Sequence, residues 1–119
     1  MMHKLVRLAI LAAPALVVAG CSVAHGTSKP VAVYMSLGSK QCQEGGRTVS
    51  DVQKTLRAAG IQVLAATCGS DGFAYPAVCG APDGRIAIVD VPAEQASAAV
   101  KLGFRLLSDR PGATRSSCS

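Results

Sequence analysis

A short apolar segment near the N-terminus constrains the fold most, because it limits which residues can belong to a folded domain. Residues 8–19 are apolar throughout, and two basic residues, Lys4 and Arg7, precede them. A run of about a dozen apolar residues is too short to cross a bilayer as a stable helix, and this order of charge and apolarity is typical of a cleavable export signal. We therefore expect this N-terminal segment to be removed and one small domain to form from the remainder.

The end of this segment resembles the lipobox of bacterial lipoproteins. It reads Val18-Ala19-Gly20-Cys21, so that small residues lead directly into a cysteine. The resemblance implies cleavage between Gly20 and Cys21 and acylation of Cys21, which would attach the protein to a membrane through lipid alone. Each buried methylene contributes about 0.8 kcal/mol, so several acyl chains hold a protein firmly. Ser22 at the next position implies an outer-membrane lipoprotein that faces the periplasm, with the inner membrane as the alternative.

Composition divides the rest of the chain into three parts. A small, polar and aperiodic stretch, residues 21–30, is typical of a flexible tether behind the lipidated cysteine. Residues 31–107 carry the periodic apolar pattern of a small domain. Residues 108–119 contain Pro, Gly, Thr and Ser and are expected to form a coil tail.

The domain is expected to have an α+β fold. Val49, Val52 and Leu56 recur at steps of three and four and predict an amphipathic helix, which Gly60 ends in a left-handed conformation. In chain order, the expected elements are a strand at 31–37, a helix at 48–59, strands at 61–67 and 85–91, a helix at 92–102 and a strand at 104–107. This order predicts the ferredoxin-like split βαβ arrangement (βαββαβ), a four-stranded antiparallel sheet with two helices on one face.

Four cysteines follow Cys21, and four cysteines in a small exported domain imply two disulfides. Cys68 and Cys79 lie at the two ends of the loop between the central strands, which favours a Cys68–Cys79 bond and leaves Cys42 to pair with Cys118. The competing pairing joins Cys42 to Cys68 or Cys79, because Cys42 follows a neighbouring strand. The spacings lack the Cys-x-x-Cys of redox sites and the close cysteine pairs of zinc sites, so no metal site is expected.

No group of residues predicts catalysis, a cofactor or a nucleic-acid partner. A nucleophile needs a base within hydrogen-bond reach, and His25, the histidine that follows the signal, lies in the expected tether. Asp71 and Asp83 each precede a glycine and are typical of turns rather than of a carboxylate pair. The basic residues behind the net charge of +5 are scattered, and the chain has two Tyr, two Phe and no Trp. Nucleic-acid binding instead requires a basic stripe with interleaved aromatic residues.

Phe73 and Tyr75 mark a candidate contact loop. Residues 73–78 place two of the four aromatic residues between two cysteines. These aromatic rings can fold back onto the sheet edge. Alternatively, they can form a contact surface, because a stapled aromatic loop binds a partner with little ordering cost.

The domain also resembles a group of small uncharacterised proteobacterial lipoproteins over most of residues 31–107. The shared pattern is Gln41-Cys42, Cys68-Gly69, Cys79-Gly80 and Asp83-Gly84-Arg85-Ile86. Cys118 lies outside this pattern, and the resemblance implies no activity. The expected function is that of a lipid-anchored, non-enzymatic periplasmic protein that binds another envelope protein or has a structural role. The alternatives are a peptidoglycan-associated module, which resembles the sporulation-related repeat in fold only, and a small periplasmic hydrolase.

Overall fold

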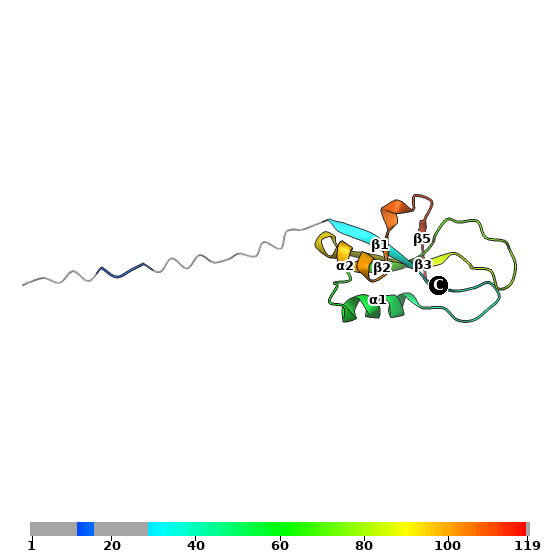
Figure 1. Cartoon of the computed structure of the whole chain (residues 1–119), viewed down its shortest axis with the longest axis horizontal. Helices are drawn as coiled ribbons and strands as arrows, with labels where there is room; N and C mark the ends of the chain where they lie inside the picture. Colours follow the sequence, from blue (N-terminus) through cyan, green and yellow to red (C-terminus); the bar gives the residue numbers. More distant parts are fainter. Residues whose placement is uncertain (1–11, 16–28, 119) are drawn as a thin grey trace, which may run out of the picture.

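The computed structural model describes residues 12–15 and 29–118 of the chain (Figure 1). The expected cleavage and lipidation site at Gly20 and Cys21 lies outside the described residues, as does His25. The described part has an α+β fold. Its elements in chain order are β1 (Pro30–Ser36), α1 (Val49–Ala58), β2 (Ala65–Ser70), β3 (Arg85–Pro92), the 3₁₀ turn η1 (Ala93–Gln95), α2 (Ala96–Lys101), β4 (Arg105–Leu106), the 3₁₀ turn η2 (Leu107–Asp109) and β5 (Thr114–Ser116).

The strands of the described part form one antiparallel sheet with the order β4-β1-β3-β2-β5. Strand β3 lies between β1 and β2, and β4 lies outside β1, as two interlocked βαβ units require. The predicted count of four strands is wrong, because β5 pairs with the outer edge of β2. The prediction of a coil tail at residues 108–119 is wrong in the same place, since this segment contains β5.

Several predicted element boundaries also differ from the structure. Strand β2 begins at Ala65 rather than at Ile61. Ile61 is 3% exposed and its N–H donates to the Leu56 carbonyl at 3.0 Å, so this residue closes the end of α1 over the core instead of pairing in the sheet. The second predicted helix is divided into η1 and α2 and ends at Lys101, and β4 has only two residues.

Helix α1 has a defined start and a defined end. The Thr48 hydroxyl accepts from the Asp51 N–H at 3.1 Å, and the Asp51 carboxylate accepts from the Thr48 N–H at 2.9 Å. This capping box satisfies two backbone donors of the first turn, and the hydrogen bonds from Thr48 lower the pKa of Asp51. Gly60 follows the helix with a φ of +77°, which confirms the predicted left-handed residue.

The face of the sheet that the helices cover holds the larger core. Alternate residues of a strand point to the same face, and Val33, Val89 and Val91 therefore lie together under the helices. They pack against Val52 and Leu56 of α1, and all five side chains are 0% exposed. The other buried members of this core are Leu37, Ile61, Ala87, Ala99 and Phe104. Both helices thus pack on one face, as predicted.

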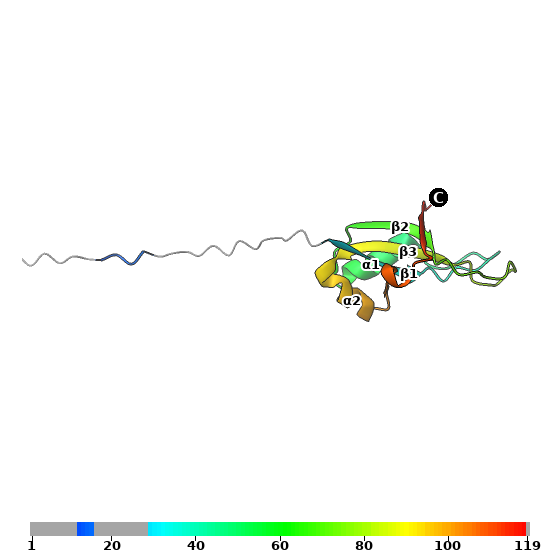
Figure 2. The ribbon, with the colours of Figure 1, turned by 90° about the horizontal axis from the view of Figure 1, so that it is seen from above.

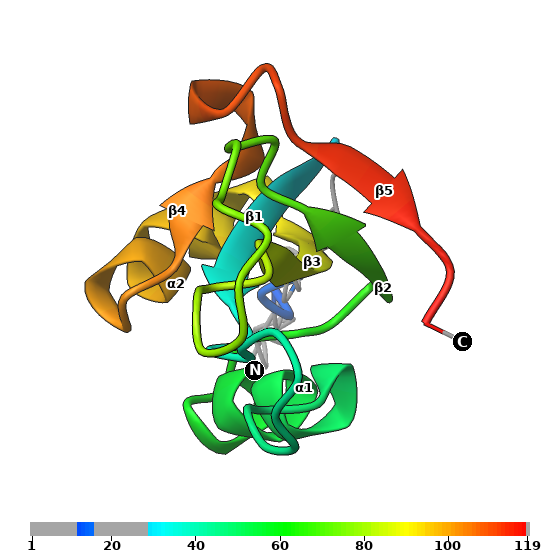
Figure 3. The same cartoon turned by 90° about the vertical axis from the view of Figure 1, so that its right-hand side faces the viewer.

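The opposite face of the sheet is covered by the last residues of the chain. We call residues 107–118 the tail segment, which lies on the side of the sheet away from α1 (Figure 3). Tyr34, Ile86 and Ile88 form a small core on this face, and Leu107 and Ala113 of the tail segment pack against it. The sheet is therefore closed by helices on one side and by an irregular segment on the other.

Candidate functional site

Two long loops leave the same end of the sheet and run side by side (Figures 1 and 2). We call residues 38–47, which follow β1, and residues 71–84, which join β2 to β3, the loop pair. The Gln41 N–H donates to the Ala81 carbonyl at 2.9 Å, and the Gly80 N–H donates to the Gln41 carbonyl at 3.0 Å. The Gln41 side-chain amide also donates to the Pro76 carbonyl at 2.9 Å. These hydrogen bonds hold the outer parts of the two loops together.

The disulfides join Cys42 to Cys79 and Cys68 to Cys118, with Cα atoms 5.1 and 5.0 Å apart. The favoured Cys68–Cys79 pairing is wrong, and so is Cys42–Cys118. Cys68 lies inside β2 rather than at its end, where β5 pairs with it and brings Cys118 alongside. Cys79 is carried outward by its loop and meets Cys42, which confirms the competing pairing. One disulfide therefore closes the loop pair, and the other fixes the tail segment.

Asp71 organises the base of the loop pair. Its side chain is buried, with 9% exposure, and its carboxylate accepts from the Phe73 N–H at 2.9 Å and from the Tyr75 hydroxyl at 2.6 Å. The hydrogen bond to Asp71 is the main cause that raises the pKa of Tyr75. Gly84 is required beside this group, because its φ is +75° and a Cβ would lie 3.0 Å from both the Asp71 carboxylate and the Tyr75 ring.

Arg110 links the tail segment to the loop pair. Its guanidinium donates to the Asp71 carbonyl at 2.9 Å and lies 3.3 Å from the centroid of the Phe73 ring. The Phe73 and Tyr75 rings meet edge to face at 6.2 Å. A cation over an aromatic face is attracted by the ring quadrupole, so Arg110 holds Phe73 in one orientation.

The two predicted contact residues have different environments. Tyr75 is partly buried and bonds to Asp71, whereas the Phe73 side chain is 55% exposed although Arg110 holds it. Val78, between Phe73 and the Cys79 disulfide, is 56% exposed. The loop pair therefore presents Phe73 and Val78 outward and uses Tyr75 as part of its base.

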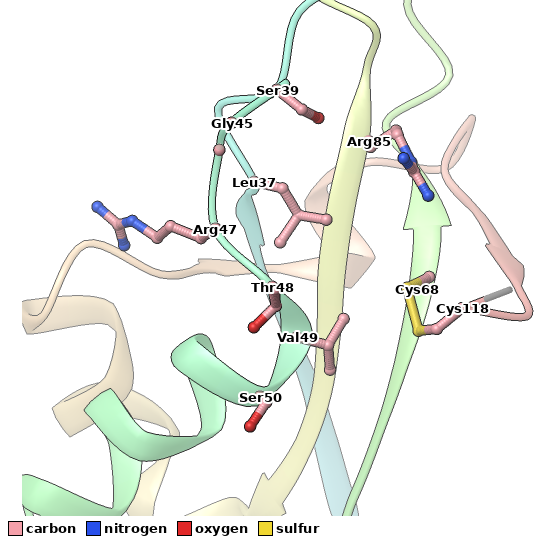
Figure 4. A pocket seen from close by; sticks show the side chains of 11 residues that line it. Leu37, Ser39, Gly45, Arg47, Thr48, Val49, Ser50, Cys68, Arg85 and Cys118 are labelled. Atoms are coloured by element: carbon pink, nitrogen blue, oxygen red, sulfur yellow. A yellow bond between two sulfur atoms is a disulfide. The ribbon is translucent and has the colours of Figure 1, made fainter. Parts of the chain in front are cut away.

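Two pockets flank Arg47 at the start of α1. The first, of about 390 Å³, lies between the start of α1 and the Cys68–Cys118 disulfide, and Figure 4 shows Arg47 pointing away from that disulfide. The capping box of α1 already occupies two backbone donors here. The second, of about 430 Å³, is lined by Arg47 and Arg105 together with Phe73 and Tyr34. It combines cationic and aromatic groups at the base of the loop pair.

The described residues offer no arrangement typical of catalysis. Asp71 and Asp83 bond to different partners, since the Asp83 carboxylate accepts from the Ser39 hydroxyl at 2.8 Å and from the Arg85 N–H at 3.0 Å. No group of three or more His, Cys, Asp or Glu in the described ranges could hold a metal ion. None of the helices at residues 12–15 and 29–118 has the length and apolar character needed to span a bilayer.

Comparison with known proteins identifies no relative. No protein-family model matches the chain, and neither a curated protein nor a solved structure matches it. Function is therefore inferred from the geometry of the loop pair and of the pocket at its base.

Proposed function

We propose that this chain is a non-enzymatic binding module of the bacterial envelope, anchored by lipid on Cys21, whose loop pair contacts a partner protein. The observation that carries this proposal is the exposure of Phe73 and Val78 on the 71–84 loop, which the Cys42–Cys79 disulfide already joins to its neighbour. An exposed aromatic side chain on an ordered loop resembles a binding hot spot, because little conformational entropy is lost when a partner covers it.

The loop pair is ordered by contacts at both of its ends. The Cys42–Cys79 disulfide joins the two loops, and Arg110 and Asp71 hold Phe73 at the base. Ser39 adds a bond between the loops through its hydroxyl, which donates to the Asp83 carboxylate at 2.8 Å. These contacts fix the loops without covering Phe73, which supports a role in recognition rather than in closing the core.

The position of the loop pair suits a protein anchored through its N-terminus. The domain begins at Pro30, at the opposite end of β1 from the loop pair (Figure 1). With an acylated Cys21 preceding Pro30, the loop pair would lie at the end of the domain remote from the anchor. Incorporation of labelled palmitate tests the anchor itself: it should occur in the unaltered chain and be lost in Cys21→Ala.

Photo-crosslinking in intact cells tests the contact. A photo-reactive residue at position 78 should give a defined protein adduct, and the same residue in place of Lys54, exposed on α1, should not. Phe73→Ala should remove the adduct from position 78 while the domain stays folded, because Phe73 is 55% exposed and its ring contacts with Arg110 and Tyr75 contribute about 1 kcal/mol. The proposal fails if position 78 gives no adduct or if positions 78 and 54 give the same products.

Co-sedimentation with purified cell-wall sacculi tests the peptidoglycan alternative. Under the proposal, the protein stays in the supernatant. Sedimentation with sacculi that Phe73→Ala leaves unchanged would favour the glycan instead of a protein partner.

A further inference from the structure

The pocket lined by Arg47 and Arg105 lies where the sheet loses its outer strand. Strand β4 pairs with β1 only at Val33 and Tyr34, whereas the pairing of β1 with β3 continues to Ser36. The last two residues of β1, which line this pocket, therefore have no partner strand on the β4 side. An unpaired strand edge can accept an extended peptide as a further strand.

The backbone of Ser36 points into this gap. The Leu37 N–H donates to the Arg85 carbonyl across the β1–β3 side at 3.0 Å. Because backbone groups of successive strand residues point to opposite sides, the N–H and carbonyl of Ser36 face the side that β4 has left open. These two groups can bond to one residue of an added peptide.

Neither arginine of the pocket forms an ion pair among the described residues, although Arg47 acts on the Asp51 carboxylate, whose pKa is lowered mainly by the hydrogen bonds from Thr48 and to a lesser degree by Lys54 and Arg47. The Arg47 guanidinium lies 2.9 Å from the Met35 sulfur, which is a weak acceptor, and Arg105 forms no ion pair in the described ranges. Asp109, which lines a neighbouring pocket with Arg105, forms no ion pair with it in the described ranges. The Asp71 carboxylate at the pocket wall already accepts from Phe73 and Tyr75. The pocket thus carries an excess of positive charge.

We propose that this pocket binds the C-terminal α-carboxylate of an extended segment of the partner protein. Arg47 and Arg105 bind the carboxylate, Ser36 pairs with the peptide backbone, and Phe73 and Tyr34 contact the last apolar side chain. The assignment deepens the proposed function, because it gives the chemistry by which a partner protein is recognised. An L-peptide is favoured over a cell-wall stem peptide, because pairing along a strand edge requires an extended L-chain.

Nuclear magnetic resonance titration of the oxidised protein tests this site. The probes are twenty peptides of the form N-acetyl-Ala-Ala-Val-Xaa with a free carboxylate and varied last residue, each matched by its C-terminal amide, and the cell-wall analogue N-acetyl-L-Lys-D-Ala-D-Ala. At least one apolar-ended acid should shift the amide resonances of Ser36 and Gly103, and its amide should bind about tenfold more weakly or worse, since a charge-assisted hydrogen bond is lost.

Arginine variants supply the matched controls. Arg105→Gln and Arg47→Gln should each weaken binding of the acid about tenfold, and Arg57→Gln, which removes an exposed arginine of α1, should not. The assignment is overturned if no acid binds, if acid and amide bind equally, if the two variants bind like the unaltered protein, or if only N-acetyl-L-Lys-D-Ala-D-Ala binds. If Arg105→Gln still gave the protein adduct from position 78, this carboxylate site would be overturned. The proposed function would then still stand, because the loop pair would still contact a partner protein.

Discussion

The two faces of the sheet differ in how they are closed. On one face, α1 and α2 press a continuous set of aliphatic side chains against β1 and β3. On the other face, the tail segment covers a small core of Tyr34, Ile86 and Ile88, and it is held by the pairing of β5 with β2, by the Cys68–Cys118 disulfide and by the bonds of Arg110. Burial of apolar area is non-directional and spread over many contacts, whereas the tail segment depends on a few directional ones.

This difference assigns separate roles to the two faces. The helix-covered face supplies most of the buried apolar surface and should determine whether the domain folds. The face covered by the tail segment positions Phe73 through Arg110, so it should determine how the loop pair is presented. Truncation in the helix-covered core should therefore loosen the whole folded domain. A change to the second face should loosen the folded structure locally, even where loss of a disulfide also lowers global stability through the unfolded chain.

The largest effect is expected from Cys68→Ser with Cys118→Ser. The bond closes a separation of 50 residues, and loop-closure entropy then gives a loss of about 4 kcal/mol in the free energy of unfolding. Hydrogen exchange should accelerate first in β2 and β5, because the tail segment is released while α1 stays packed. Equal acceleration in α1 would show that the two faces are not independent. The matched variant Cys42→Ser with Cys79→Ser should leave β5 protected.

Leu56→Ala should have the next largest effect. Leu56 is 0% exposed in the helix-covered core, and such truncations lower the free energy of unfolding by about 2–5 kcal/mol. Urea denaturation should show one cooperative transition whose midpoint lies at a lower urea concentration than in the unaltered protein. Leu64→Ala, at an aliphatic residue that is 43% exposed, should change stability by about 0.5 kcal/mol or less. If hydrogen exchange accelerated in α1 alone while the tail segment stayed protected, the global role of this face would be contradicted.

Arg110→Gln should have a smaller and local effect. It removes a charged hydrogen bond to the Asp71 carbonyl and the contact with the Phe73 ring, which together contribute about 2 kcal/mol. Arg115→Gln is the control, because the Arg115–Asp90 ion pair lies at the surface and contributes about 1 kcal/mol or less. Exchange of the Phe73 amide should accelerate only in Arg110→Gln. If the two variants were equally stable, Arg110 would not hold the loop pair.

The smallest effect concerns pH and the Tyr75 hydroxyl. The bond to Asp71 raises the pKa of Tyr75 above its ordinary value of about 10. The protonated hydroxyl therefore stabilises the folded state fully below that ordinary pKa, and this contribution is lost as the pH rises through the raised pKa. Ultraviolet titration of tyrosinate should show Tyr75 ionising at lower pH in Asp71→Asn. If Tyr75 ionised at the same pH in Asp71→Asn, the hydrogen bond to Asp71 would not be the cause of the raised pKa.

The helix-covered face could be predicted from the sequence because repeating contacts leave a repeating pattern. The spacing of Val49, Val52 and Leu56 predicts α1, and Gly60 predicts its end, and both are present in the structure. The order of the first four strands and the shared face of the helices followed from these elements. The fifth strand could not be predicted, because Thr114–Ser116 is exposed throughout and has no apolar alternation.

The candidate site could be predicted only in part, because its contacts join distant residues without any periodicity. Phe73 was found from its position between two cysteines, and its exposure agrees with a contact role. Asp71 was interpreted as a turn residue, which misses its bonds to Tyr75 and Phe73, and Arg110 was not considered at all. The available signal for the role of Arg110 was an arginine within a tail of mostly small residues. The disulfide pairing was missed because it depends on β5, which brings Cys118 beside Cys68 and leaves no periodic pattern in the sequence.

A disulfide map of the oxidised protein tests most directly the claim that separate disulfides hold the loop pair and the tail segment. Trypsin alone leaves Cys68 and Cys79 in one peptide, since no Lys or Arg lies between Arg57 and Arg85. A second cleavage before Asp71 separates them. The account predicts that the peptide with Cys42 is linked to the one with Cys79, and the peptide with Cys68 to the one with Cys118. Linkage of Cys68 to Cys79 would contradict it, because Cys42 and Cys118 would then lose the partners that join the loops and fix the tail segment.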